Sequence, residues 1–186
     1  MREEDIPQYQ TKRVRLIPLT DKWVEQLIEW RAQPEAQQHQ PITALGREQL
    51  RRYIQSKKAK KAFDLEQNDY ILIIEDEETG VGVGWMTLEI ASRVHGLARI
   101  GYTISAEHWG QGYATAAVKS IVYLLFSQTP VERIEADCSV NNPASRRVLE
   151  KCGFRYVGTK RKYLVIQGQR VDHHNFELCK EDVTSS

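Results

Sequence analysis

The chain has 186 residues, of which 41% are hydrophobic and 27% charged, a length and composition typical of a soluble globular domain. Its 26 basic and 25 acidic side chains leave a net charge of +1, so bulk charge points to no particular partner, and an anionic ligand would need a local site. The three cysteines are widely spaced without a Cys-x-x-Cys pair, which favours reduced thiols over a disulfide framework or a zinc site. We therefore expect a cytoplasmic protein without a bound metal.

The ends of the chain and its apolar runs argue against secretion and membrane insertion. The start, MREEDIP, carries acidic residues where a signal peptide has basic ones, and no apolar stretch follows it. The longest apolar runs, residues 71–74 and 121–126, are far shorter than the roughly 20 residues that a membrane-spanning helix needs. We predict a single domain over residues 11–181, with flexible ends at residues 1–10 and 182–186.

The first third of the chain has a strand followed by two helices. Residues 14–19 are typical of a strand, and Asp21 is placed to cap a helix that ends at Pro34. A second helix is predicted over residues 47–61, where a lysine cluster stands at its C-terminal end. Those lysines could contact RNA, but they lie in no recognition motif and suit the negative end of the helix dipole, so we expect them to stay solvated.

The rest of the chain contains strands and helices in an order typical of a mixed sheet. Antiparallel strands are predicted at residues 70–74, 81–90 and 98–105, followed by a helix after residue 112 and a strand at residues 133–140. A short helix and a terminal hairpin, with strands at residues 154–166 and 170–179, complete the chain. The predicted order is β-α-α-β-β-β-α-β-α-β-β, an α/β (α+β) arrangement.

Two glycines mark the junction between the third strand of the meander and its helix. Gly110 and Gly112 allow the backbone to curl tightly, and the helix that follows presents unpaired N–H groups with a partial positive charge. This combination favours binding of a phosphate group. The plainer interpretation is a tight strand-to-helix connection. No Lys-Ser/Thr follows the second glycine, which excludes a Walker-type nucleotide loop.

A second segment, residues 142–154, adds to the interpretation of the glycine junction. In residues 142–154, Asn142 fits an N-cap, Pro143 the first helical position and Gly153 the helix end, which alone indicates an ordinary short helix. Together and in this order, WGQGYA at residues 109–114 and NPASRRVLEKCGF at residues 142–154 resemble the coenzyme A motifs of the general N-acetyltransferase (GNAT) superfamily. Trp109 replaces the family's first Arg/Gln. The sequences of residues 100–104 and 167–173 are similar to those of the subgroup that includes ribosomal-protein N-terminal acetyltransferases.

The resemblance covers about residues 11–181 and implies the GNAT fold, a mixed, mostly antiparallel sheet of six or seven strands flanked by helices. Acetyl-CoA would lie in a wedge between the strands that end at Ser105 and Val140, with its pyrophosphate on the glycine turn. Its pantetheine arm would pair with backbone at the end of the earlier strand. The implied cofactor-binding residues are Thr103, Ile104, Ser105, Gly110, Gln111, Gly112, Tyr113, Ala114, Thr115, Asn142 and Ser145.

Acetyl transfer to an amine needs a neutral nucleophile and a proton for the leaving thiolate. An α-amino group has a pKa near ~8, against about 10.4 for lysine, so an N-terminal acceptor needs little help from a base. Relatives often carry a glutamate where this chain has Arg99 and Ala116. Candidate carboxylates here are Asp137, on an expected central strand, and Glu89, and each could equally be a salt-bridge partner; Glu107, beside the loop, reads better as a solvated charge.

The resemblance makes Ser145 the candidate proton donor to the thiolate, with Tyr102 and Tyr156 as alternatives. Direct attack on the thioester is preferred because no cysteine stands in a nucleophile setting; Cys138 and Cys152 are both expected to be buried.

The predicted function is transfer of acetyl from acetyl-CoA to a protein N-terminal α-amine. The alternatives are a small amine acceptor, namely a polyamine, an amino acid or an aminoglycoside, and a non-catalytic acyl-CoA-binding module. The acceptor pocket is expected from Trp30, Arg31, residues 39–42, the turn near His95 and the terminal hairpin. A homodimer stays open, and nucleic acid is not expected as a partner.

Overall fold

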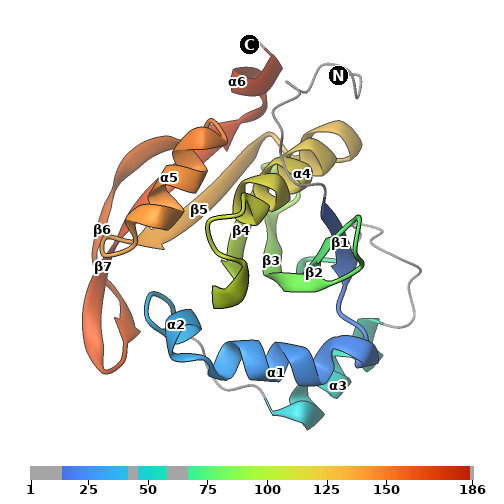
Figure 1. Ribbon diagram of the computed structural model, residues 1–186. Coiled ribbons are helices and arrows are strands. Elements are labelled where there is room, and N and C mark those ends of the chain that lie inside the picture. Colours follow the sequence, from blue (N-terminus) through green and yellow to red (C-terminus); the bar gives the residue numbers. More distant parts are fainter. Residues whose placement is uncertain (1–13, 42–45, 58–66, 185–186) are drawn as a thin grey trace.

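The computed structural model describes residues 14–41, 46–57 and 67–184, and its centre is a single seven-stranded sheet (Figure 1). The strand order is β1-β2-β3-β4-β5-β7-β6, and every neighbouring pair is antiparallel except β4 and β5. The prediction of a mixed, mostly antiparallel sheet is therefore confirmed. The strands are β1 (Val14–Pro18), β2 (Asp69–Asp76), β3 (Gly82–Ser92), β4 (Leu97–Ile104), β5 (Arg133–Ser139), β6 (Arg155–Ile166) and β7 (Gln169–Cys179).

Helices cover both faces of this sheet. Between β1 and β2 the chain forms α1 (Val24–Ala32), α2 (Pro34–Gln37) and α3 (Arg47–Lys57), which lie together below the sheet in Figure 1. The opposite face carries α4 (Tyr113–Gln128) and α5 (Pro143–Lys151). Two 3-10 turns, η2 (Asp21–Trp23) and η3 (Ala106–His108), and the terminal α6 (Lys180–Thr184) complete the described elements.

Two predictions in the first third of the chain need correction, and a third extends beyond the described residues. Asp21 is not an N-cap: it is the first residue of η2, Thr20 precedes it at the cap position, and no side chain caps this turn. Pro34 does more than end a helix, because it begins α2, where a missing N–H is tolerated. The described helix α3 ends at Lys57, and the rest of the predicted lysine cluster lies outside the described residues. The single-domain range 11–181 stays a prediction.

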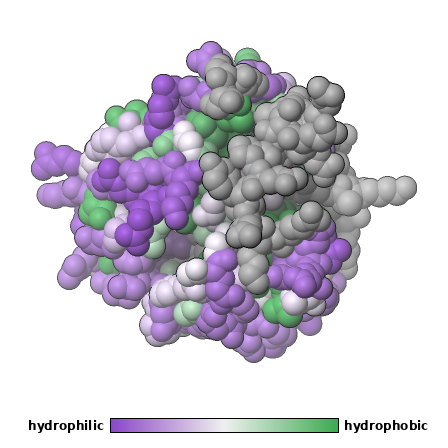
Figure 2. Space-filling view, turned by 45° about the horizontal axis from the view of Figure 1, so that its top comes forward, coloured by the Kyte–Doolittle hydropathy of each residue, from purple (hydrophilic) through white to green (hydrophobic). Residues whose placement is uncertain are grey.

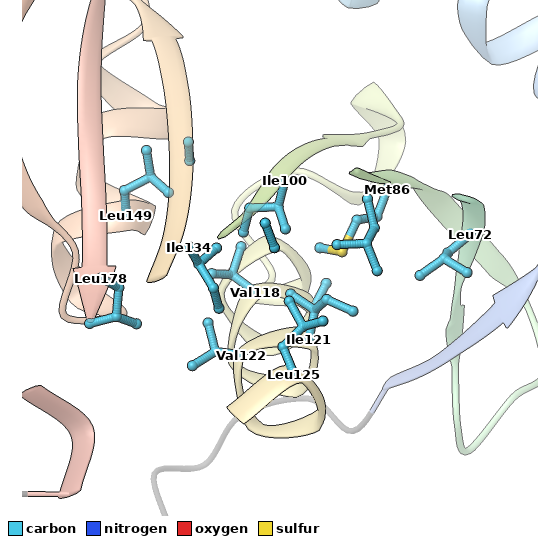
Figure 3. Packing of buried hydrophobic residues seen from close by; sticks show 14 of the residues in the cluster. Leu72, Met86, Ile100, Val118, Ile121, Val122, Leu125, Ile134, Leu149 and Leu178 are labelled. Carbon is cyan, nitrogen blue, oxygen red and sulfur yellow. The ribbon is translucent and has the colours of Figure 1, made fainter. Parts of the chain in front are cut away.

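The larger core packs α4 against the sheet (Figure 3). Val118, Ile121, Val122 and Leu125 recur at helical spacing on α4 and are buried, together with side chains of β3, β4 and β5 such as Met86, Ile100 and Ile134. Each such burial contributes about 1.5–3 kcal/mol before entropy is counted. Because α4 follows the glycine turn directly, this packing fixes where the turn lies.

A second core holds the α1–α3 layer on the other face. Trp30 of α1 stacks on Trp85 of β3, with ring centroids 6.3 Å apart. Leu27 of α1, Leu50 of α3 and Ile73 of β2 are buried in the same cluster. This packing fixes the position of α2 and of the segment that follows it. Trp30 is thus a core residue and does not line the acceptor pocket for which it was predicted.

The described surface is mostly polar on the face shown in Figure 2, where hydrophobic side chains form only small patches. Among the described helices, none is both long and apolar enough to cross a membrane.

Candidate active site

The glycine turn has the conformation that its sequence requires. Gly110 and Gly112 have φ values of 74° and 88°, a left-handed region that other residues rarely adopt. Apart from the adjacent residues of the turn, no atom of the described part of the chain lies within 4 Å of where a Cβ would stand at either position, so the space beside the turn is open. Gly112 is the N-cap of α4 and provides no side-chain acceptor. The first amides of α4 are therefore available to an anionic ligand, as predicted.

A buried hydrogen bond anchors this turn. The Tyr113 hydroxyl at the start of α4 donates to Asp76 Oδ2 at 2.6 Å, and Asp76 Oδ1 accepts from the Thr79 amide at 2.9 Å. The Tyr113 bond and the Thr79 amide lower the pKa of Asp76 to about 2. Asp76 thereby ties the glycine turn to the turn between β2 and β3. Sequence reasoning missed Asp76, because nothing local pairs it with a residue 37 positions away.

The end of β4 is fastened by its own loop. Trp109 Nε1 donates to the Ile104 carbonyl at 2.7 Å, and Ser105 Oγ lies 2.8 Å from His108 Nδ1. Trp109, which departs from the family pattern, therefore closes the strand end. Gln111 turns away from the cavity described below, and its Nε2 donates to the Glu107 carbonyl.

A wedge opens between β4 and β5. The two strands are paired only at Leu97–Arg133, Ala98–Ile134 and Arg99–Glu135, and then separate. Figure 1 shows β5, β7 and β6 set apart from the strands β1 to β4. Beyond the last pair, each strand presents an edge without a neighbouring strand. Such an edge can hydrogen-bond an extended ligand.

Alternation along the strands decides which backbone groups face the wedge. The Ser105 amide donates to the Val83 carbonyl, so Ser105 and Thr103 direct their backbone groups toward β3. The groups that face the wedge belong to Tyr102 and Ile104, and the Ile104 carbonyl is already taken by Trp109. The prediction of backbone pairing at Thr103 and Ser105 is thus corrected to Tyr102 and the Ile104 amide. After β5, the Val140 amide donates to the Asp172 carbonyl of β7. By the same alternation, the backbone groups of Asp137 and Ser139 face the wedge.

The second motif forms the capped helix that was predicted. Asn142 Oδ1 accepts from the Ser145 amide at 3.0 Å, with Pro143 at the first position of α5. The Ser145 hydroxyl lies 3.0 Å from the Tyr102 hydroxyl, which also donates to the Ser145 carbonyl at 3.2 Å. Burial raises the pKa of Tyr102, so its phenol stays protonated at neutral pH. The structure thus places Ser145 and Tyr102 together.

The two predicted carboxylates have different surroundings. Asp137 accepts from Lys160 Nζ and from Asn175 Nδ2, each at 2.9 Å. It is therefore a salt-bridge partner, which was the alternative to its role as a base. Glu89 lies exposed near the end of β3, with Oε2 3.6 Å from Arg99 Nη1. It lines a second hollow of about 780 Å³, to which Asp137 also contributes, and does not line the cavity that contains Ser145.

One cavity of about 710 Å³ joins these features and is lined from both faces of the sheet. The α4–α5 side contributes the glycine turn, Ser145 and two cations on α5, Arg147 and Lys151, which the sequence analysis did not select. The α1–α3 side contributes the segment after α2, and β5 and β7 contribute Asp137 and His173. Of the predicted cofactor residues, those lining the cavity are Thr103, Ile104, Gly110, Gly112, Tyr113, Ala114, Thr115, Asn142 and Ser145.

Two parts of the predicted acceptor pocket line this cavity, and the pocket itself stays a prediction. Residues 38–41 and the terminal hairpin, through Tyr163 and His173, line the cavity, and Gln40 Nε2 donates to Thr103 Oγ1 at 2.6 Å. Arg31 and His95 do not line it, and residue 42 lies outside the described residues.

The cysteines near the wedge are poorly suited to act as nucleophiles. Cys138 is buried, as predicted, whereas Cys152 is only half-buried. Burial raises the pKa of both thiols to about 11, which leaves little thiolate at neutral pH. Within the described residues, no group of three or more metal-binding side chains is found.

Comparison with known proteins gives one family match. Residues 13–155 match the family described as "Acetyltransferase (GNAT) domain". By sequence, the chain is 30% identical over 115 residues to an uncharacterized N-acetyltransferase (p20) of Bacillus licheniformis, an alignment that covers 62% of this chain and 64% of the relative. The chain thus matches less than two thirds of that relative's length.

Two solved structures share the fold. The Vibrio cholerae spermidine N-acetyltransferase in complex with CoA and spermine has a TM-score of 0.80 and 16% identity, covering 92% of this chain and 98% of that one. RimL, a ribosomal L7/L12 alpha-N-protein acetyltransferase in complex with CoA, has a TM-score of 0.77 and 18% identity, covering 94% and 97%. These likenesses establish the fold, and the two acceptors in their names differ in chemistry.

Proposed function

This chain belongs to the acetyltransferase (GNAT) family, and on that premise we propose that it transfers an acetyl group from acetyl-CoA to a protein N-terminal α-amine. The observation that carries the proposal is the cavity through the sheet, which joins the glycine turn on one face to the segment after α2 on the other. Two reactants entering from opposite faces would meet in the wedge. That geometry suits direct transfer in a ternary complex.

The residues present fit acetyl-CoA, which would supply an activated acetyl thioester. The amides of Tyr113, Ala114 and Thr115 at the start of α4 would hold the diphosphate. Arg147 and Lys151 line the same end of the cavity and would add positive charge for phosphate groups. Wedge-facing backbone of Tyr102 and Ser139 would hydrogen-bond the amides of the pantetheine arm.

On the thiol side, we assign the proton donor to Ser145. Its hydroxyl lies on the first turn of α5 and lines the cavity. The Tyr102 phenol, 3.0 Å from the Ser145 hydroxyl, orients it and can itself serve as the alternative donor. Since an alkyl thiol has a pKa of roughly 8.5, protonating its thiolate is a modest aid to turnover. Asp137 and Glu89 are not assigned as bases, because one is ion-paired and the other lies outside the cavity.

The charge of the acceptor side favours a single amine over a polyamine. Within the described residues, the carboxylates that line the cavity are Glu35 and Asp137, and Lys160 neutralises Asp137. A polyamine carries several positive charges at neutral pH and would need several unpaired carboxylates. An α-amine carries one charge and loses it near pH ~8. A protein N-terminus therefore fits this pocket better than spermidine or an aminoglycoside.

The deciding experiment measures thiol release from acetyl-CoA with several acceptors in parallel: peptides with ribosomal-protein N-termini, polyamines, amino acids and aminoglycosides. We expect the peptides to give the highest kcat/KM. Calorimetry with CoA alone tests the cofactor site separately. Tight CoA binding without thiol release from any acceptor would support the alternative, a non-catalytic acyl-CoA-binding module. Faster release with a polyamine would overturn the acceptor assignment. A cytoplasmic location and a homodimer stay predictions.

A further inference from the structure

A histidine on the acceptor side of the cavity has an unused ring nitrogen. His39 follows α2 and lines the cavity. Its Nδ1 atom is shielded from solvent and has no hydrogen-bond partner within the described part of the chain. Leaving a buried polar atom unpaired costs roughly 1–3 kcal/mol, which a bound hydrogen-bond donor would recover.

The position of His39 is fixed relative to the wedge. Its neighbour Gln40 donates from Nε2 to Thr103 Oγ1 at 2.6 Å, which ties the segment after α2 to β4. Thr103 lies between Tyr102 and Ile104, whose backbone faces the wedge. The Thr103 side chain points to the α1–α3 face, whereas Tyr102 points to the opposite face, where it meets Ser145. His39 and Ser145 thus approach the wedge from opposite sides.

The surroundings of His39 keep its ring neutral. Burial lowers the pKa of His39 below its usual 6.5, so the imidazole can accept a proton at neutral pH. The other titratable groups on the acceptor side are Glu35 of α2, Asp137 of β5, Tyr163 of β6 and His173 of β7. Asp137 is paired with Lys160, and His173 Nδ1 lies 3.2 Å from the Val171 carbonyl. Glu35 is exposed to solvent.

We infer that His39 is a catalytic residue that takes the proton from the acceptor amine during acetyl transfer, an inference that rests on the proposed function. The amine nitrogen forms a bond to the acetyl carbon, and the carbon–sulfur bond of the thioester breaks with its electron pair on sulfur. The N–H proton passes to His39 Nδ1, with the other ring proton on Nε2. The thiolate takes its proton from Ser145, which regains one through the open cavity, and the imidazolium loses a ring proton once the products have left.

The kinetic test uses His39→Asn, His39→Gln and His39→Ala, with His95→Asn, an exposed histidine outside the cavity, as the matched control. We expect each His39 variant to lose about 100-fold in kcat/KM at neutral pH, the lower end of the effect of a general base. CoA affinity should be unchanged. The wild-type rate should rise through an apparent pKa below 6.5, and this limb should vanish in His39→Asn. Added imidazole should restore part of the rate of His39→Ala.

A nuclear magnetic resonance titration gives a readout independent of turnover. The ring signal that is missing in His39→Asn should titrate below pH 6.5 and should shift when an acceptor peptide is added to the CoA complex. The inference is overturned if this signal ignores the peptide, or if His39→Asn keeps its rate within about twofold with an unchanged pH profile. Lack of thiol release by the wild-type protein with every amine would instead count against the proposed acetyl transfer.

Discussion

The two sides of the cavity are built from different kinds of groups. On the α4–α5 side the ligand-facing groups are largely backbone: the amides after Gly112 and the free edges of β4 and β5. On the α1–α3 side they are side chains from separate segments, such as His39, Asp137 and His173. Backbone groups are available whatever the neighbouring side chains, provided that the chain can bend. The α4–α5 side therefore depends on few particular side chains, whereas the α1–α3 side depends on side-chain identity.

The largest expected effect follows from placing a side chain in the glycine turn. Gly112→Val forces a β-branched residue into a left-handed conformation and fills the open space beside the turn. We expect CoA affinity in calorimetry to fall by about 100-fold. The matched control is Gly168→Val, which has a similar φ of 78° and equally open surroundings, but lies in the turn between β6 and β7. Equal losses in both variants would mean that the turn does not hold the ligand.

Removing the Ser145 hydroxyl tests the catalytic end of the cofactor side. Ser145→Ala should lower kcat by about tenfold while leaving the KM for acetyl-CoA unchanged, because the thiolate leaves more slowly without a proton donor. Stopped thiol-release assays measure both constants. Ser127→Ala, an exposed serine on α4, serves as the control. An unchanged kcat in Ser145→Ala, with a drop in Tyr102→Phe, would transfer the donor role to Tyr102.

The acceptor side should respond to a different substitution. Gln40→Leu removes the hydrogen bond that ties the segment after α2 to Thr103. One such bond contributes about 1 kcal/mol, so we expect the KM for the acceptor peptide to rise about fivefold while the KM for acetyl-CoA stays constant. Gln55→Leu on the exposed surface of α3 is the control. A rise in both KM values would show that the two sides are not independent.

The smallest effect concerns the anchor of the glycine turn. The folded pKa of Asp76 is about 2, below its ordinary 3.8, so its contribution to stability is complete above about pH 4 and is lost as the pH falls toward 2. Tyr113→Phe removes the largest cause of this shift, so the variant should lose less stability over that window. Urea unfolding at about pH 5 and about pH 2.5 measures the difference. Tyr123→Phe on the same helix is the control, and equal losses in all three proteins would contradict the assignment.

Features with local causes were predictable from the sequence. The cap of α5 could be predicted because Asn142 and Ser145 are three positions apart, so that the Asn142 side chain reaches the Ser145 amide. The glycine turn could be predicted because Gly110 and Gly112 permit a conformation that other residues avoid. The terminal hairpin, joined at residues 167–168, could also be predicted.

Features that join distant segments were not predictable in this way. The bond between Gln40 and Thr103 spans 63 positions, and no spacing rule pairs them. The sequence makes Asp137 a candidate base, but Lys160, from a strand two places away in the sheet, is its ion-pair partner. The predicted backbone pairing over residues 103–105 was wrong for Thr103 and Ser105, but not contradicted for the Ile104 amide, because the register with β3 determines which groups face the wedge.

By itself, the sequence determined the seven strands, the longer helices and the glycine turn, since these follow from backbone preferences within a few residues. Only the tertiary structure decided that β4 and β5 separate after Arg99 and Glu135, and that His39 and Ser145 face the resulting opening from opposite sides. Those facts depend on how two hydrophobic clusters pack against the two faces of one sheet. Packing of that kind sums weak contacts between residues far apart in the chain, so no short segment carries it.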